Sequence, residues 1–166
     1  SAASDVYKRQ ADYGRMRVEL TGAASGSPFL ITALSGTTGI YQQSIGSSLT
    51  TASLGTFSHY AVAFYNDGSN LITKLYVNGV LNDTNSASST LNELNSVGMT
   101  GRIGALLTSS ASPSGPAGQA YSGKLSGSLD EFRFWKTRRD SKQIFDNYNK
   151  QVRGGANNDI SNATLG

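Results

Sequence analysis

Carboxylates are the groups from which hydrolytic chemistry on sugars would have to be built in this chain. Retaining hydrolysis of a glycosidic bond uses two carboxyl groups about 5 Å apart on one face of a protein. The chain has three glutamates, Glu19, Glu93 and Glu131, which lie far apart in the sequence. Asp130 and Glu131 are adjacent, so a strand would point them to opposite faces. We therefore predict that this acidic pair is structural, bonded to Arg133 or to a loop amide, and that the chain is not an enzyme.

A histidine-activated nucleophile and a phosphate-binding loop each lack a residue that their chemistry needs. His59 is the only histidine, and no Gly-x-Ser-x-Gly motif supplies a nucleophile for it. Residues 118–124 have the spacing of a phosphate-binding loop, but Leu125 replaces the Ser or Thr that would hold magnesium. Strand-like sequence also follows where a helix should begin. We predict that His59 packs at the start of a strand and that residues 118–124 bind no phosphate.

Oxygen-bearing side chains at the ends of two predicted hairpins are the candidates for a metal site. Calcium takes about six to eight oxygen ligands from carboxylates, amides and carbonyls. Asp67 and Asp83 are the first candidate ligands, with Asn66, Asn70 and Asn82 nearby. Asn and Asp are also the residues that tight turns require. The sequence thus predicts no obligatory cofactor and leaves calcium binding at Asp67 and Asp83 open.

Sugar recognition by stacking needs an exposed aromatic ring with polar groups beside it. Tyr41, Tyr65 and Tyr121 are the candidate rings, and Asn66, next to Tyr65, is the candidate amide. Each of these tyrosines is equally suited to packing in a core or at its rim. A glycan or another cell-surface ligand is the partner that these residues would serve.

The composition favours short strands joined by polar turns. A chain of 166 residues has the length of one domain. Charged residues make up 15% of the chain, and 19 residues are glycine. The net charge is +3, and the basic residues near the C-terminus are interspersed with Asp140, Asp146 and Asp159. This mixture indicates a solvated helical face rather than a nucleic-acid site. Without cysteine or an apolar run of about 20 residues, the sequence predicts no disulfide, no thiolate metal site and no membrane insertion.

Apolar periodicity predicts the strands that must position these residues. Met16, Val18 and Leu20 fall on one face of segment 15–20, as in a half-buried strand. Asn66-Asp67-Gly68 and Asn78-Gly79 supply the turns of two successive hairpins. Strands are expected at 15–20, 29–34, 39–45, 59–65, 71–77, 80–82 and 101–107, and in two halves of 124–135. We predict an all-β fold, a two-sheet antiparallel β-sandwich of the jelly-roll type.

One short helix is expected near the C-terminus. Asp140 can cap a helix over residues 141–150, with Gln143 at the third position. Its apolar stripe would consist of Ile144, Phe145 and Tyr148. Residues 108–118, which contain only Ser, Thr, Pro, Gly and Ala, are expected to form an exposed loop.

The ends of the chain differ from the predicted domain at 11–153. Residues 1–10, "SAASDVYKRQ", resemble the peptide that results when a sequencing-library adapter is translated. We expect this segment to be an artefact or a disordered arm, and if it is an artefact the first strand of the fold is missing. Residues 154–166 are rich in Asn and Gly and are expected to be a linker or the start of a next module.

The order of motifs over residues 59–148 resembles a known signature. The segments "HYAVAFYNDGSNLITKLYVNGVLND", "GRIGAL" and "YSGKLSGSLDEFRFWKTRRDSKQIFDNY" are similar to the laminin-G-like, concanavalin A-like (pentraxin-like) jelly-roll domain. The resemblance implies two stacked antiparallel sheets, surface placement, and roles in adhesion or glycan recognition, with calcium bound in some members. The pentraxin cysteine pair is absent here. The tail "QVRGGANNDISNATLG" resembles segments of phage or other virion structural proteins.

We therefore expect a non-catalytic adhesion, carbohydrate-binding or structural module of a larger extracellular, cell-surface or virion protein. Its partners would be a glycan or cell-surface ligand and the neighbouring domains of the same protein. One alternative is a divergent glycoside hydrolase of the laminarinase-like sandwich type, against which the missing pair of glutamates argues. The other is a purely architectural spacer, which would bind no glycan.

Overall fold

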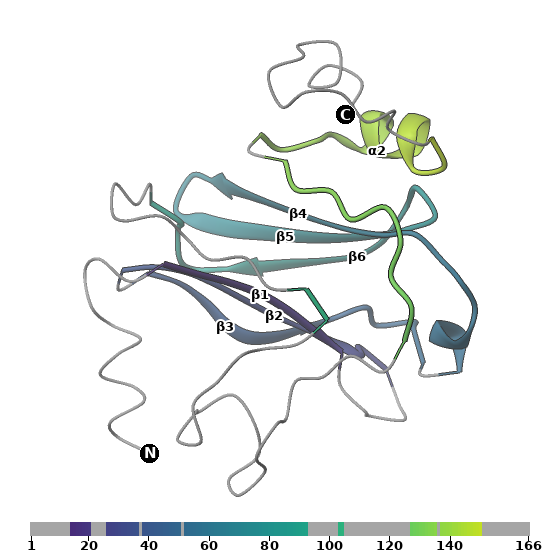
Figure 1. The fold of residues 1–166 in the computed structure, drawn as a ribbon. Coiled ribbons are helices and arrows are strands. Elements are labelled where there is room, and N and C mark those ends of the chain that lie inside the picture. The colour runs from purple at the N-terminus through teal and green to yellow at the C-terminus, as the bar shows by residue number, and fades with distance from the viewer. Residues whose placement is uncertain are drawn as a thin grey trace, which may run out of the picture.

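Two antiparallel sheets stacked on each other form the body of the protein in the computed structural model (Figure 1). The structure describes residues 14–20, 26–36, 38–50, 52–92, 103–104, 127–135 and 137–150. The first sheet contains β1 (Gly14–Leu20), β2 (Phe29–Ser35) and β3 (Thr38–Ile45), and the second contains β4 (Tyr60–Asp67), β5 (Asn70–Val77) and β6 (Val80–Ala87). A 3-10 turn, η1 (Ser53–Gly55), lies between the sheets in sequence, and α2 (Ser141–Asn147) follows near the C-terminus. The predicted two-sheet sandwich with one short C-terminal helix is confirmed.

The core lies between the sheets and is supplied mainly by their central strands. Phe29 and Ile31 of β2 pack with Ile45 of β3 and with Leu71 and Leu75 of β5, and all five are almost completely buried. Burial of a side chain of this size contributes about 1.5–3 kcal/mol. The alternation of Leu71 and Leu75 with more polar positions is what points one face of β5 toward the first sheet.

The hairpin between β5 and β6 turns at Asn78-Gly79, as the sequence predicts. Asn78 has φ 50° and Gly79 has φ 81°, so both central residues adopt the positive φ of a type I′ turn. β6 then continues to Ala87, well beyond the predicted end at residue 82. Its polar sequence carries no apolar alternation, but its backbone stays paired with β5 as far as Leu71. An edge strand needs only that one partner.

The C-terminal helix forms where its cap predicts and packs on the second sheet. The Asp140 carboxylate accepts the Gln143 N–H at 2.7 Å, and the Gln143 side chain accepts the Asp140 N–H at 3.0 Å, which completes a capping box. α2 ends at Asn147, three residues earlier than expected. Ile144 is buried against the outer face of the second sheet, whereas Phe145, predicted on the same stripe, is exposed.

Strand β1 is present, but its apolar face is not buried as predicted. Met16 and Val18 pair with Ala33 and Ile31, so they point toward the core side of the first sheet, yet both are exposed. Contacts between the described strands of the two sheets join β5 and β6 to β3 instead, which leaves β1 at the far edge. On the opposite face Arg17 is only 8% exposed.

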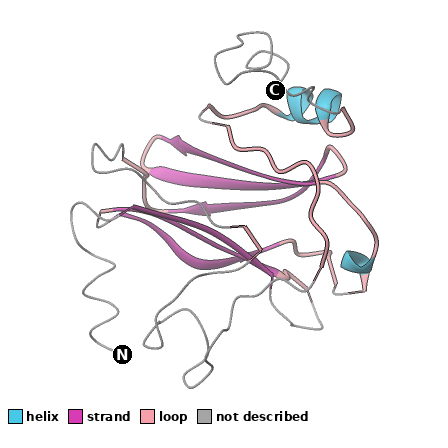
Figure 2. Cartoon of the chain, in the orientation of Figure 1, coloured by secondary structure: helices cyan, strands magenta, loops and turns pink. Residues whose placement is uncertain are grey.

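The predicted strand pair over 124–135 is wrong for the described residues 127–135, which contain no strand (Figure 2). Glu131 has φ 52°, a left-handed conformation that interrupts an extended run. Phe132 and Phe134 are each 65% exposed, so their alternation with polar residues does not correspond to burial on one face. A strand also needs a neighbour that takes its backbone hydrogen bonds, and no described strand pairs with this segment.

Several predictions concern residues outside the described ranges. These are the artefact or arm at 1–10, the tail at 154–166, the loop at 108–118 and the phosphate-loop spacing at 118–124. Only residues 103 and 104 of the expected strand 101–107 are described, and neither is in a strand. The predictions for residues outside the described ranges stay predictions.

Replacing Gly79 with Ala should destabilise the domain more than the same change at Gly68. Both glycines have positive φ, which costs an L-residue about 1–2 kcal/mol. At Gly79 the added Cβ would also lie 2.7 Å from Tyr148 Cδ1 and 3.1 Å from Phe145 Cα, whereas at Gly68 it would meet nothing within 4 Å. Urea unfolding of both variants measures the difference. Equal losses of stability in the two variants would show that contact with the end of α2 does not restrict residue 79.

Candidate ligand-binding surface

Tyr65 lies on the outer face of the second sheet, where two cations approach its ring. It pairs with Ile72 across β4 and β5, and Lys74 lies two residues further along β5 on the same face. The guanidinium carbon of Arg138 lies 4.1 Å from the centre of the Tyr65 ring, and the Lys74 Nζ lies 5.6 Å from it. Both distances are within the range of a cation–π interaction.

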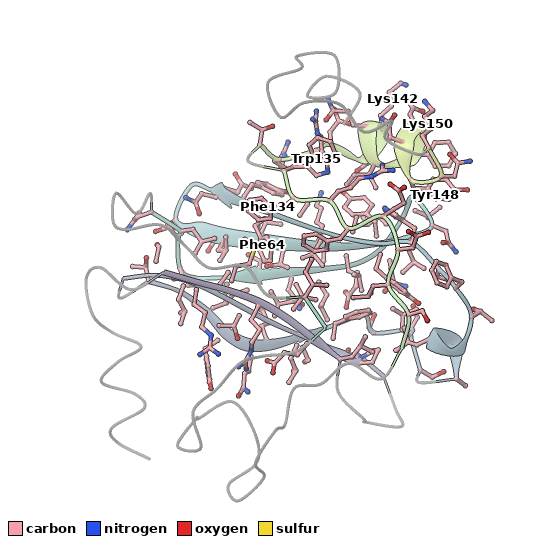
Figure 3. All side chains as sticks on the ribbon, viewed as in Figure 1. Phe64, Phe134, Trp135, Lys142, Tyr148 and Lys150 are labelled. Atoms are coloured by element: carbon pink, nitrogen blue, oxygen red, sulfur yellow. The ribbon has the colours of Figure 1, made fainter. Side chains whose placement is uncertain are left out.

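A second cation–π pair lies a few residues from the first in sequence. The guanidinium carbon of Arg139 lies 4.4 Å from the centre of the Trp135 ring. Trp135 is beside α2, on the side of the second sheet that faces away from the first sheet (Figure 3). We call Tyr65, Lys74, Trp135, Arg138 and Arg139 the stacked surface.

The segment that carries Trp135 and the two arginines is fastened to α2 on both sides. Arg133 donates to the Asn147 carbonyl oxygen at 3.3 Å and also to the carbonyl oxygen of Lys150, so it holds the C-terminal end of the helix. Asp140 caps the N-terminal end. Since α2 is itself anchored on the sheet through Ile144 and through the Tyr76 hydroxyl, 2.9 Å from Ser141 Oγ, the stacked surface has a fixed scaffold.

The structure separates the residues that the sequence proposed for sugar binding. Asn66 follows Tyr65 but points the other way, and its amide exchanges two hydrogen bonds with the backbone of Leu91, at 2.8 and 2.9 Å. Tyr41 is exposed on β3, in the other sheet. Tyr121 lies outside the described residues. Of the three that the structure describes, Tyr65 alone belongs to the stacked surface.

Asp83 of β6 links the second sheet to the residues that follow β3 in the first sheet. Its Oδ2 accepts the N–H groups of Gly46 at 2.8 Å and Ser47 at 3.0 Å, and its Oδ1 accepts the Thr84 N–H at 2.8 Å. Burial acts to raise the pKa of Asp83, but the three backbone donors outweigh it and the pKa is lowered. Both carboxylate oxygens are therefore committed to the backbone.

Asp67 and Asp83, the first candidates for calcium, lie at different ends of the second sheet. Asp67 pairs with Asn70 and Asp83 with Leu75. The five steps from residue 70 to residue 75, at about 3.3 Å each, put the two positions about 16 Å apart along β5. Within the described part of the chain, no group of three or more His, Asp or Glu side chains is placed to hold a metal ion. The structure thus does not bring the two aspartates into one site.

The described glutamates are each engaged with a nearby arginine. Glu19 forms an ion pair with Arg17, and Glu131 lies 3.2 Å from the Arg133 guanidinium. Asp130 accepts the N–H of Glu131 at 2.9 Å. The predicted bonds of the acidic pair to Arg133 and to a loop amide are confirmed. Glu93 lies outside the described residues.

His59 occupies a packed position at the start of β4. Its backbone exchanges two hydrogen bonds of 2.9 Å with Asn78, one to the side chain and one from the main-chain N–H. Its ring centre lies 6.0 Å from that of Tyr148. Burial lowers the pKa of His59, and the charge of Arg133 lowers it further, so the neutral imidazole is favoured. This environment agrees with the packing role predicted for His59.

Sequence reasoning found Tyr65 but missed its partners on the stacked surface. The basic residues near the C-terminus were interpreted as a solvated helical face, which describes Lys142 and its ion pair with Asp146. Arg138 and Arg139 instead precede the helix. The sequence signal that was available is a Trp followed within four residues by two arginines and then by a helix cap.

Two stacked antiparallel meanders with a helix on one outer face define a lectin-type β-sandwich. The chain matches the laminin-G family model of the concanavalin A-like lectin/glucanases superfamily over residues 2–145, and it belongs to this family. The resemblance drawn from its motifs is therefore confirmed. The crystal structure of an S-layer domain-containing protein from Clostridium thermocellum is similar to this chain, with a TM-score of 0.42 and 20% identity. The similarity covers 81% of this chain and 64% of that chain. No curated protein matches the chain.

Replacing Asp83 with Ala should destabilise the domain by about 1–2 kcal/mol at neutral pH, because three backbone N–H groups lose a charged acceptor at a partly exposed site. Since the folded pKa is lowered, this contribution is present above the ordinary aspartate pKa and is lost as pH falls below about 4. The stability of wild type and Asp83→Ala should converge in acid. Urea unfolding across pH measures this. A gap that stayed constant down to pH 2 would contradict it.

Proposed function

We propose that this domain is a non-catalytic saccharide-binding module of a larger extracellular or cell-surface protein. Membership of the concanavalin A-like lectin/glucanases superfamily supports a sugar ligand in general terms. The observation that carries the proposal is the stacked surface. It places hydrogen-bond donors over aromatic rings on one outer face, and donors and aromatic rings are the groups that saccharide recognition uses.

The attachment of this surface to the sandwich supports binding. Tyr65 and Lys74 project from paired strands, and Arg138 and Arg139 lead directly into a capped helix. Groups held by rigid elements lose little freedom when a ligand arrives, so more of the interaction energy is available for binding. The sequence-derived candidate Tyr41 lies on the other sheet, outside this site.

The chemistry of the described acids supports a role without catalysis. Glu19 and Glu131 are bonded to arginines, and Asp83 is bonded to backbone amides. A retaining hydrolase would need two carboxyl groups that face each other across a substrate. The glycoside hydrolase and the architectural spacer are the two rival functions.

The proposal also includes an extracellular or cell-surface location and neighbouring domains in the same protein. In the described residues, no helix has the length and apolar character of a membrane span. A virion location, predicted from the tail at 151–166, rests on residues outside the described ranges and stays a prediction.

A glycan array probed with the folded chain tests the proposal. We expect binding to a subset of saccharides, and Trp135→Ala should weaken it because the ring that orders Arg139 is lost. Tyr41→Ala, on the other sheet, is the matched control and should bind as wild type does.

Incubation with the saccharides that bind should release no reducing sugar. Release would favour the hydrolase instead. A folded sample that bound no saccharide on the array would favour the spacer.

A further inference from the structure

The stacked surface presents hydrogen-bond donors where bare aromatic faces would otherwise lie. Arg138 covers one face of Tyr65 at 4.1 Å, and Arg139 covers one face of Trp135 at 4.4 Å. A neutral sugar could stack on these faces only by displacing a guanidinium group. The planar guanidinium carries its N–H groups at its edges, where they can hold a carboxylate or a sulfate at two points. This arrangement favours acidic groups over neutral ones.

The charge of the stacked surface and its surroundings is positive. Lys74, Arg138 and Arg139 supply three cations. The carboxylates nearest to the surface in sequence are Asp67, two residues after Tyr65 at the end of β4, and Asp140, which follows Arg139. Asp140 is already bonded to the start of α2. The ion pairs between described residues involve Arg17, Arg133 and Lys142, so Lys74 and Arg138 take part in none of them.

We infer that the stacked surface binds an acidic polysaccharide, whose carboxylate or sulfate groups pair with Arg138 and Lys74. The inference rests on the proposed function and narrows the ligand from saccharides in general to anionic ones. Because the Tyr65 ring already orders Arg138, this side chain loses less rotational freedom on binding than an extended surface arginine would.

The same geometry argues against single-stranded nucleic acid as the ligand. Proteins bind single strands largely by stacking successive bases on open aromatic faces. Here the faces of Tyr65 and Trp135 that Arg138 and Arg139 cover are not open. A repeating acidic sugar needs only guanidinium N–H groups, and Arg138 is exposed.

Trp135 provides a direct readout, because it is the only tryptophan of the chain. Its fluorescence would be titrated in the intact chain with alginate, dextran sulfate, neutral dextran and an oligothymidylate, and calorimetry on the same samples would detect binding anywhere on the chain. Alginate carries carboxylates and dextran sulfate carries sulfates, so the two separate the acidic groups. We expect at least one of them to change the fluorescence, with an affinity that falls as salt rises.

Four variants distinguish binding at the stacked surface from attraction that depends only on net charge. Arg138→Gln should weaken binding about tenfold, and Arg138→Lys should also weaken it, because an ammonium lacks the planar pair of donors. Lys142→Gln is the matched control, since it removes an equal charge from α2 at an ion pair outside the surface, and it should change affinity by less than about twofold. Asp67→Asn removes a neighbouring negative charge and should tighten binding. Thermal melts confirm that each variant is folded.

The outcomes distinguish the inference from the proposed function. Binding of acidic polysaccharide that Arg138→Gln leaves unchanged, or that Lys142→Gln weakens equally, would overturn the inference. Tight binding of oligothymidylate with the same dependence on Arg138 would overturn it in favour of nucleic acid. If only neutral saccharides bind, the inference fails while the proposed function stands. If no saccharide binds by calorimetry or on the array, the proposed function itself fails.

Discussion

The arrangement of the whole domain depends on covering β5 on both faces. One face carries Leu71 and Leu75, which are fully buried against the first sheet, and the other carries Tyr76, which is almost as deeply buried. A central strand with two apolar faces cannot be satisfied by one neighbouring layer. The first sheet covers one side, and α2, through Ile144, covers part of the other. The position of the helix, and with it the stacked surface, therefore follows from the core.

Polar side chains complete what the apolar core begins, by fastening the edges of the two sheets to each other. Asp83 of β6 accepts N–H groups at the end of β3, and Asn85 donates to the Ser44 carbonyl oxygen at 2.6 Å. After β6, the Ser89 hydroxyl accepts the Gly39 N–H at 2.7 Å. Among the described strands none pairs with β3 on its other side, and these side chains bond main-chain groups in and just after β3.

Sequence patterns correctly predicted the features that depend on residues close together in the sequence. The Asn78-Gly79 turn, the Asp140 and Gln143 cap and the alternation of β5 each depend on residues a few positions apart. The contact of Arg138 with Tyr65 joins segments that are distant in the sequence, and no local pattern encodes it. The strand expected around Phe132 and Phe134 failed for a related reason, because alternation shows that a strand is compatible with a segment but cannot supply the partner strand.

The close approach of Tyr148 to Gly79 sets an order of assembly. A helix of seven residues is not stable in water by itself, so α2 must be held by the surface on which it lies. That surface includes the β5–β6 turn, which exists only after the hairpin has closed. Stable docking of the helix therefore requires this hairpin to be closed. The arginines that precede it come to rest on their aromatic rings at the same stage, as a product of the finished domain.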